Sequence, residues 1–229
     1  MSPGLIEPED DDEILDVDPD ALRFNAVMTG DVFEDVTVAG LDESGVVMIA
    51  GHPCTICGRN GALQPRVACV RVVSFQAVPY RRWPAGFFNH FPLPDVSGAG
   101  TRAADLQEWL TVDSAQLDRG HRRLTLTEWG VIVMQQRIIH SLTRFVVPPT
   151  GLEEAARPVL REAELERDWV EHLTGIGSLE RQITDFNAFM GEADRRTRLQ
   201  DRTKESSVRR EVATEIRARR GAADTASPA

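Results

Sequence analysis

The hydrophobic pattern of this chain of 229 residues changes its period near Gly98-Ala99-Gly100, and this change constrains the fold more than any other feature. Before these residues, short runs rich in β-branched and aromatic residues predict strands. They cover residues 26–33, 36–41, 46–50 and 66–78. After them, large apolar residues recur at the three- and four-residue spacing of a helix face. The sequence therefore predicts an α+β fold, with a small N-terminal β-meander or barrel-like domain followed by a helical C-terminal half.

Three positions are predicted to begin helices in this second half. Thr101 can cap a helix whose apolar face consists of Leu106, Trp109, Leu110 and Leu117. Thr125 has capping-box spacing to Glu128, which predicts a core helix that ends at Pro148. The apolar face of that helix consists of Trp129, Val133, Ile138, Ile139, Leu142 and Phe145. Another helix is expected to begin after Ser178.

These signals divide the chain into five segments. We expect a disordered acidic leader over 1–22, because it carries too few large apolar residues to bury a face. A β-rich domain over 23–100 and a helical region over 101–190 follow. A charged helix over 191–220 and a disordered tail over 221–229 complete the chain.

Charge is distributed unevenly along a chain whose net charge is −10. Residues 1–35 contain twelve acidic residues against Arg23 alone, whereas residues 195–220 contain ten basic and four acidic residues. Such charge runs are typical of solvated surfaces. Two functional interpretations stand beside this one. Residues 195–220 could bind nucleic acid, or the acidic and basic segments could screen each other until a partner separates them.

All three cysteines lie in one stretch, at Cys54, Cys57 and Cys69. A Cys-x-x-Cys pair closed by a glycine is typical of a metal-binding turn, and thiolate and imidazole ligands select zinc. The sequence therefore predicts a zinc site held by these cysteines and either His52 or His90. The alternatives are unliganded thiols, because Cys69 stands alone in a strand pattern, and redox chemistry.

A second unusual stretch covers residues 75–94, where six of the fourteen aromatic residues alternate with four prolines. The prolines exclude a regular helix or an inner strand. One interpretation is a long loop whose aromatic side chains pack inward on the core. The other is a surface anchor for a protein partner, because aromatic residues dominate interface energetics. The anchor residues would be Trp83, Phe87, Phe88 and Phe91.

Beyond Gly191, large apolar residues become rare, and Val208, Val212 and Ile216 form a narrow stripe at helical spacing. A stripe of this width suits packing against one helix but not a core. We therefore expect the charged helix to contribute little to the fold and to use the stripe to bind a protein partner or a second copy of the chain.

The sequence contains no phosphate-binding glycine loop, serine nucleophile elbow or metalloprotease motif, which favours a non-enzymatic role. The first hypothesis is an intracellular adaptor, assembly or virion structural protein that acts through protein–protein contacts, with or without zinc. One alternative is a nucleic-acid-binding regulator that uses the basic segment. The other is a hydrolytic enzyme whose site is not recognisable.

Neither a long apolar run nor a basic-then-apolar N-terminal signal occurs, so we expect a cytoplasmic protein with no membrane partner. Lys204 is the only lysine among 26 basic residues. This bias is typical of a GC-rich genome and indicates an actinobacterium or one of its phages. A phage origin would place the protein in the virion.

Overall fold

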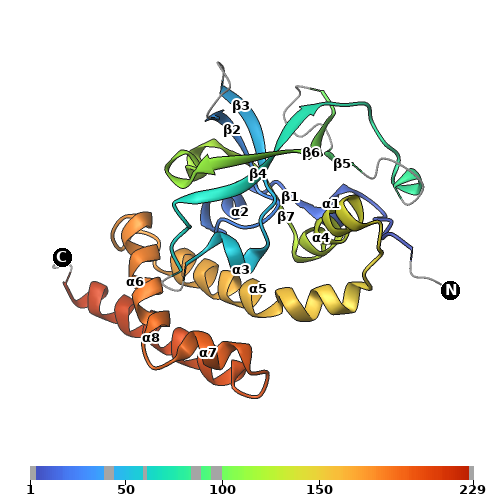
Figure 1. Cartoon of the computed structure of the whole chain (residues 1–229). Helices are drawn as coiled ribbons and strands as arrows, with labels where there is room; N and C mark the ends of the chain where they lie inside the picture. The colour runs from blue at the N-terminus through green and yellow to red at the C-terminus, as the bar shows by residue number, and fades with distance from the viewer. Residues whose placement is uncertain (1–3, 39–43, 59–60, 84–88, 94–99, 227–229) are drawn as a thin grey trace. The chain divides into compact units, whose positions relative to one another are not determined.

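The computed structural model describes residues 4–38, 44–58, 61–83, 89–93 and 100–226 (Figure 1). The chain forms two compact units. Unit 1 consists of residues 1–23, 27–57 and 63–156, and unit 2 consists of residues 24–26, 58–62 and 157–229. An antiparallel sheet occupies the N-terminal half and helices dominate the C-terminal half, which confirms the predicted α+β class.

Unit 1 is built on a seven-stranded antiparallel sheet in the order β1-β7-β2-β3-β4-β6-β5. The strands are β1 (Leu15–Asp16), β2 (Val32–Thr37), β3 (Ser44–Ile49), β4 (Arg66–Ser74), β5 (His90–Leu93), β6 (Arg102–Asp113) and β7 (Arg122–Leu126). Because β2, β3 and β4 pair in chain order, they form a meander. The edge strands are β1 and β5, and no pairing between described residues closes the sheet into a barrel.

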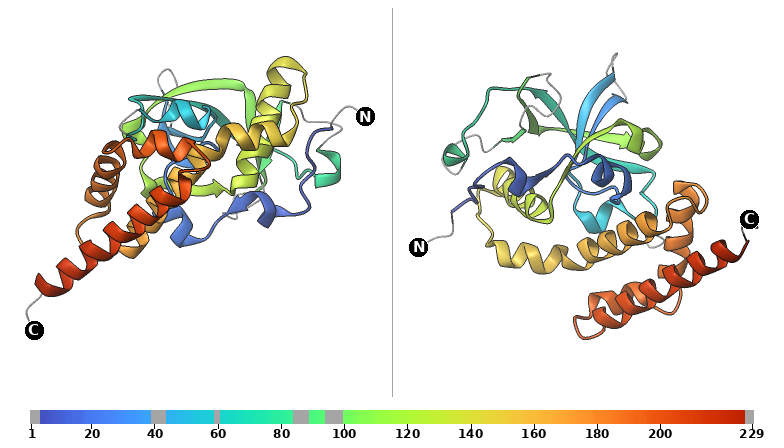
Figure 2. Two further views of the ribbon diagram at one scale, coloured as in Figure 1. Left: turned by 90° about the horizontal axis from the view of Figure 1, so that it is seen from below. Right: turned by 180° about the vertical axis from the view of Figure 1, so that it is seen from behind.

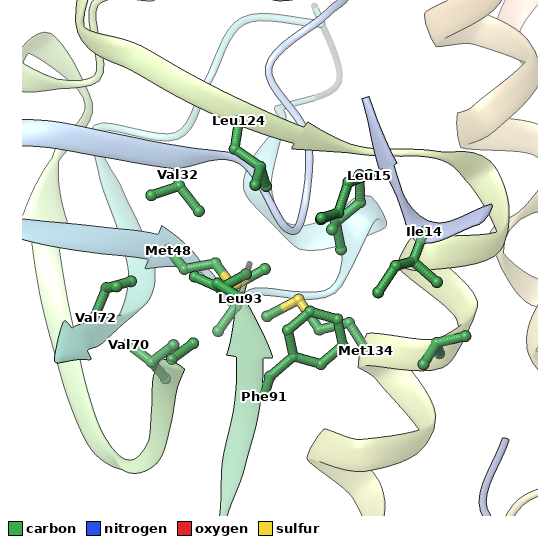
Figure 3. Close-up of a cluster of buried hydrophobic side chains, with 14 of the residues drawn as sticks. Ile14, Leu15, Val32, Met48, Val70, Val72, Phe91, Leu93, Leu124 and Met134 are labelled. Carbon is green, nitrogen blue, oxygen red and sulfur yellow. The ribbon is translucent and has the colours of Figure 1, made fainter. Parts of the chain in front are cut away.

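The sheet buries both of its faces. On one face, Met134 of helix α4 (Glu128–Thr143) and Ile14 of the short helix α1 (Asp11–Ile14) join a cluster of strand side chains (Figure 3). On the other face, Ile56 of helix α3 (Pro53–Ile56) packs in a second cluster. The neighbouring residues Met48 and Ile49 belong to opposite clusters, as the alternation of side chains along a strand requires.

The prediction of a helix after Thr101 is wrong, because residues 102–113 form strand β6. Along β4, Val70 pairs with Trp109 and the next residue pairs with Asp105, so the three intervening residues of β6 form a bulge. The bulge resets the alternation, burying Leu106 and leaving Trp109 39% exposed. Apolar residues three positions apart thus occupy a strand here and imitate the pattern of a helix.

The N-terminal segment differs from the disordered leader expected over 1–22. Its described residues form α1, β1 and most of α2 (Pro19–Phe24). Asp10 caps α1 by accepting a hydrogen bond from the Glu13 backbone N–H at 3.0 Å. Ile14 is fully buried and its carbonyl oxygen accepts a hydrogen bond from the Thr127 N–H at 3.1 Å. Leu5, Leu15 and Ala21 are also buried, so apolar side chains and backbone contacts hold a segment whose acidic side chains mostly face solvent.

The predicted core helix exists as α4, with different ends. Its N-cap is Thr127, whose hydroxyl accepts a hydrogen bond from the Gly130 N–H at 3.0 Å, rather than Thr125. The helix ends at Thr143, because Arg144 adopts a left-handed backbone conformation with φ of +61°.

A buried ion pair joins three segments of unit 1. Arg122 Nη1 lies 2.8 Å from Asp31 Oδ2, and neither side chain is exposed to solvent. Asp31 also accepts hydrogen bonds from the Thr125 hydroxyl at 2.5 Å and the Met28 N–H at 3.0 Å. Arg122 Nε donates to the Leu22 carbonyl oxygen at 2.9 Å. These hydrogen bonds help to offset the free-energy cost of removing both charges from water.

Unit 2 is helical. Its helices are the C-terminal part of α5 (Pro149–His172), α6 (Leu179–Gly191), α7 (Arg195–Gln200) and α8 (Glu205–Ala226) (Figure 2). Ser178 caps α6 as predicted, its hydroxyl accepting a hydrogen bond from the Arg181 N–H at 3.3 Å. The remaining elements of the described chain are 3-10 turns at Tyr80–Arg82, Ser114–Gln116 and Arg119–His121.

The C-terminal stripe is part of the core of unit 2, which corrects our expectation of a free helix over 191–220. Val208, Val212 and Ile216 are buried in one cluster with Trp169 and Phe186. Helix α8 also continues to Ala226, into the segment expected to be disordered. The stripe is narrow because it needs to meet only the apolar faces of α5 and α6.

The contact between α1 and α4 predicts a specific sensitivity at Gly130. A Cβ atom there would lie 2.1 Å from the Ile14 carbonyl oxygen, so backbone would have to move. We expect Gly130→Ala to lower the free energy of unfolding by about 1–3 kcal/mol in urea denaturation. The matched control is Gly151→Ala in α5, where the added methyl group meets nothing within 4 Å and should stabilise by about 0.5–1 kcal/mol. Equal changes in the free energy of unfolding for the two substitutions would contradict the close contact between Gly130 and Ile14.

The burial of the stripe predicts that α8 stabilises unit 2. Val212→Ala should lower the free energy of unfolding by roughly 1–3 kcal/mol, because it removes buried methyl groups and leaves a cavity. Thr214→Ala changes an exposed position of the same helix and should alter stability by less than about 0.5 kcal/mol. If Val212→Ala proves as neutral as the control, the stripe is not docked.

Candidate functional site

The predicted zinc ligands lie on different elements of the structure. His52 is exposed before α3, Cys57 is half-buried after it, Cys69 is buried in β4 and His90 belongs to β5. Cys54 lies in α3, and its side chain is outside the described part. Among the described side chains, no group of three or more His, Cys, Asp or Glu residues could hold a metal ion. The zinc site therefore stays a prediction.

Cys69 lies in an environment that favours a neutral thiol. It is fully buried in the same apolar cluster as Val67 and Val112. Burial raises the pKa of the Cys69 thiol to about 12, whereas a zinc ligand must be deprotonated. Burial also lowers the pKa of His52, which favours the neutral imidazole that metal binding requires.

The protonation of Cys69 predicts selective labelling. Iodoacetamide reacts with thiolates, so in the folded protein near neutral pH it should label Cys57 and leave Cys69 unlabelled. Peptide mass spectrometry measures both, and urea-unfolded protein, in which both should react, is the control. Labelling of Cys69 as fast as Cys57 in folded protein would contradict its burial. Protection of Cys57 by added zinc, with zinc found by elemental analysis, would support the predicted metal.

The two described residues of the predicted surface anchor, Trp83 and Phe91, pack inward, so they do not form an exposed anchor. Trp83 and Phe91 are buried, with ring centroids 5.4 Å apart in an edge-on arrangement. The Arg137 guanidinium lies 4.7 Å from the centroid of the Trp83 ring, and its Nη2 donates to the Trp83 carbonyl oxygen at 2.7 Å. Phe87 and Phe88 lie outside the described residues.

Most basic residues of segment 195–220 face carboxylates. Arg195 and Arg198 approach Glu211 to 3.0 and 2.5 Å, and their hydrogen bonds lower the pKa of Glu211. The residues of this segment found in ion pairs are Arg195, Arg196, Arg198, Lys204, Arg209 and Arg219. Because phosphate binding depends on available positive charge, this pairing does not favour the nucleic-acid alternative.

An exposed apolar surface occurs at the end of α4, and we call Leu142 and Phe145 the α4 ridge. Leu142 is 64% exposed and Phe145 is 74% exposed, although the sequence pattern placed both in the core. The local backbone is fixed on both sides of the ridge. The Arg144 N–H donates to the His140 carbonyl oxygen at 2.8 Å. The buried Gln136 side chain donates to the Val147 carbonyl oxygen at 2.8 Å.

Helices α5 and α8 border a groove of about 500 Å³ in unit 2, which we call the α5–α8 groove. Arg157 pairs with Glu205 at 2.6 Å, and Glu164 pairs with Arg209 one turn further along α8, so the helices run in the same direction (Figures 1 and 2). The groove begins where these ion pairs end. Leu165, Val212 and Ile216 contribute its apolar lining.

Charged and polar side chains border this apolar lining. Asp168 and His172 come from α5, and Arg209 and Arg217 come from α8. Although much of Asp168 is exposed, desolvation of its carboxyl group raises its pKa, and nearby His172 opposes this shift. His172 Nδ1 donates to the Asp168 carbonyl oxygen at 2.8 Å, which leaves Nε2 as the other ring nitrogen able to bind a ligand.

The sequence matches no protein-family model and no curated protein at a significant level. None of the helices in the described ranges is long and apolar enough to cross a lipid bilayer. The α4 ridge and the α5–α8 groove are therefore the candidate functional surfaces. Sequence reasoning missed both, because a leucine or phenylalanine at helical spacing indicates a core position unless the packing of the helix is known.

Proposed function

We propose that this protein is a non-enzymatic adaptor, assembly or virion structural protein that acts through protein–protein contacts, including self-association. The α4 ridge carries the proposal. A single exposed leucine is ordinary on a protein surface. Here two large apolar side chains, three positions apart, project from a helix end whose backbone is fixed by hydrogen bonds. Contiguous exposed apolar side chains are typical of interaction sites.

The ridge suits a reversible contact. Burying a leucine or phenylalanine side chain fully contributes about 1.5–3 kcal/mol. Two such side chains cannot by themselves offset the association cost of about 4–15 kcal/mol. The partner surface must therefore add contacts around them, and association should depend on protein concentration.

The proposal predicts that charge on the ridge abolishes association. Analytical ultracentrifugation over a wide concentration range should show a wild-type mass that rises with concentration. The double variant Leu142→Glu/Phe145→Glu should stay monomeric, because burying two carboxylates costs more than the contact yields. The matched control is Val17→Glu, since Val17 is a 49% exposed apolar residue elsewhere in unit 1. A wild-type protein that is monomeric throughout, or a double variant that associates like wild type, would contradict the proposal.

A further inference from the structure

We infer that the α4 ridge binds the α5–α8 groove of a second copy of this chain. This inference rests on the proposed function, because it names the partner of the same ridge. It joins two surfaces of opposite character, one projecting and apolar and the other hollow with an apolar lining.

The two surfaces agree in size. The groove follows two helices from Leu165 to His172, about two turns or roughly 10 Å. Leu142 lies in the last turn of α4 and Phe145 follows the end of the helix, so their Cα atoms are at most about 11 Å apart, a span comparable to the length of the groove. Its volume of about 500 Å³ lies within the roughly 300–1,000 Å³ range of binding clefts.

Charge is complementary at both borders of the groove. Arg144 lies between the two ridge residues, is exposed, and forms no ion pair with any described residue, so it can meet Asp168 of the second copy. The last carbonyl groups of α4 carry the partial negative charge of a helix C-terminus. They can meet Arg217, whose guanidinium contacts only the Ala213 carbonyl and the Thr214 hydroxyl among the described residues.

The contact is heterologous, because the ridge and the groove are different surfaces on each copy. Each copy keeps a free groove after its ridge is bound, and a free ridge after its groove is bound. Copies therefore add in one direction and form either a ring or an open chain. This property distinguishes the inference from a symmetric dimer formed by two ridges.

Complementation of two blocked variants tests the inference. Leu142→Glu/Phe145→Glu blocks the ridge, and Ala213→Trp fills the groove from an exposed position on α8. Each variant alone should be monomeric by native mass spectrometry, whereas their equimolar mixture should form a dimer that does not grow. Ala218→Trp, at another exposed position of α8 outside the groove lining, should assemble like wild type. Thermal melting should show that all variants remain folded.

A charge exchange provides an independent second measurement. Arg144→Asp and Asp168→Arg should each weaken association by about tenfold, and the chain carrying both substitutions should regain it. A mixture of blocked variants that stays monomeric, or a double exchange that is weaker than either single one, would overturn the inference.

The outcomes separate this inference from the proposed function. If the ridge-blocked variant is monomeric while Ala213→Trp assembles like wild type, the ridge is an interface but the groove does not receive it. If the ridge-blocked variant itself assembles like wild type, the proposed function fails, and the inference fails with it.

Discussion

The ion pair between Arg122 and Asp31 is the interaction on which unit 1 depends. Both charges are removed from water, so each must find hydrogen-bond partners within the protein, and they find them on α2, on β7 and in the turn before β2. Removing one partner of such a pair typically costs about 3–5 kcal/mol, because the other charge is left buried and unpaired. The pair therefore specifies how the N-terminal segment meets the sheet, and the Ile14 contact with α4 follows from that placement.

Local signals in the sequence were sufficient for much of the fold. The predicted runs 46–50 and 66–78 became β3 and β4, and the Ser178 hydroxyl caps α6 by accepting a hydrogen bond from a backbone N–H that has no acceptor within the helix. Strand β2 instead spans the gap between the predicted runs 26–33 and 36–41. Strand β6 could not be predicted, because a bulge set by pairing with β4 changes which residues share a face. The ordered N-terminus was missed for a related reason, since the burial of Ile14 depends on a helix more than a hundred residues away.

The candidate sites were harder to predict than the fold. Val212 and Leu142 are both aliphatic residues on helices, yet the first is buried and the second is exposed. The sequence around each residue does not distinguish the buried one from the exposed one, because burial depends on whether another element covers that face of the helix. The same limit applies to charge. Arg195 and Arg198 suggested a phosphate-binding surface until Glu211, on another helix, proved to be their partner.

The pairing of β1 with β7 also constrains the order in which unit 1 can be completed during synthesis. Leu15 pairs with Leu126, so its partner leaves the ribosome 111 residues later. At the usual rate of about 5–20 residues per second, the N-terminal segment waits roughly 5–20 s for its strand partner. During that interval its dense negative charge favours solvation and opposes association with other nascent chains. The acidity of the first 35 residues is therefore compatible with a segment that is ordered in the finished protein but must be among the last parts to fold.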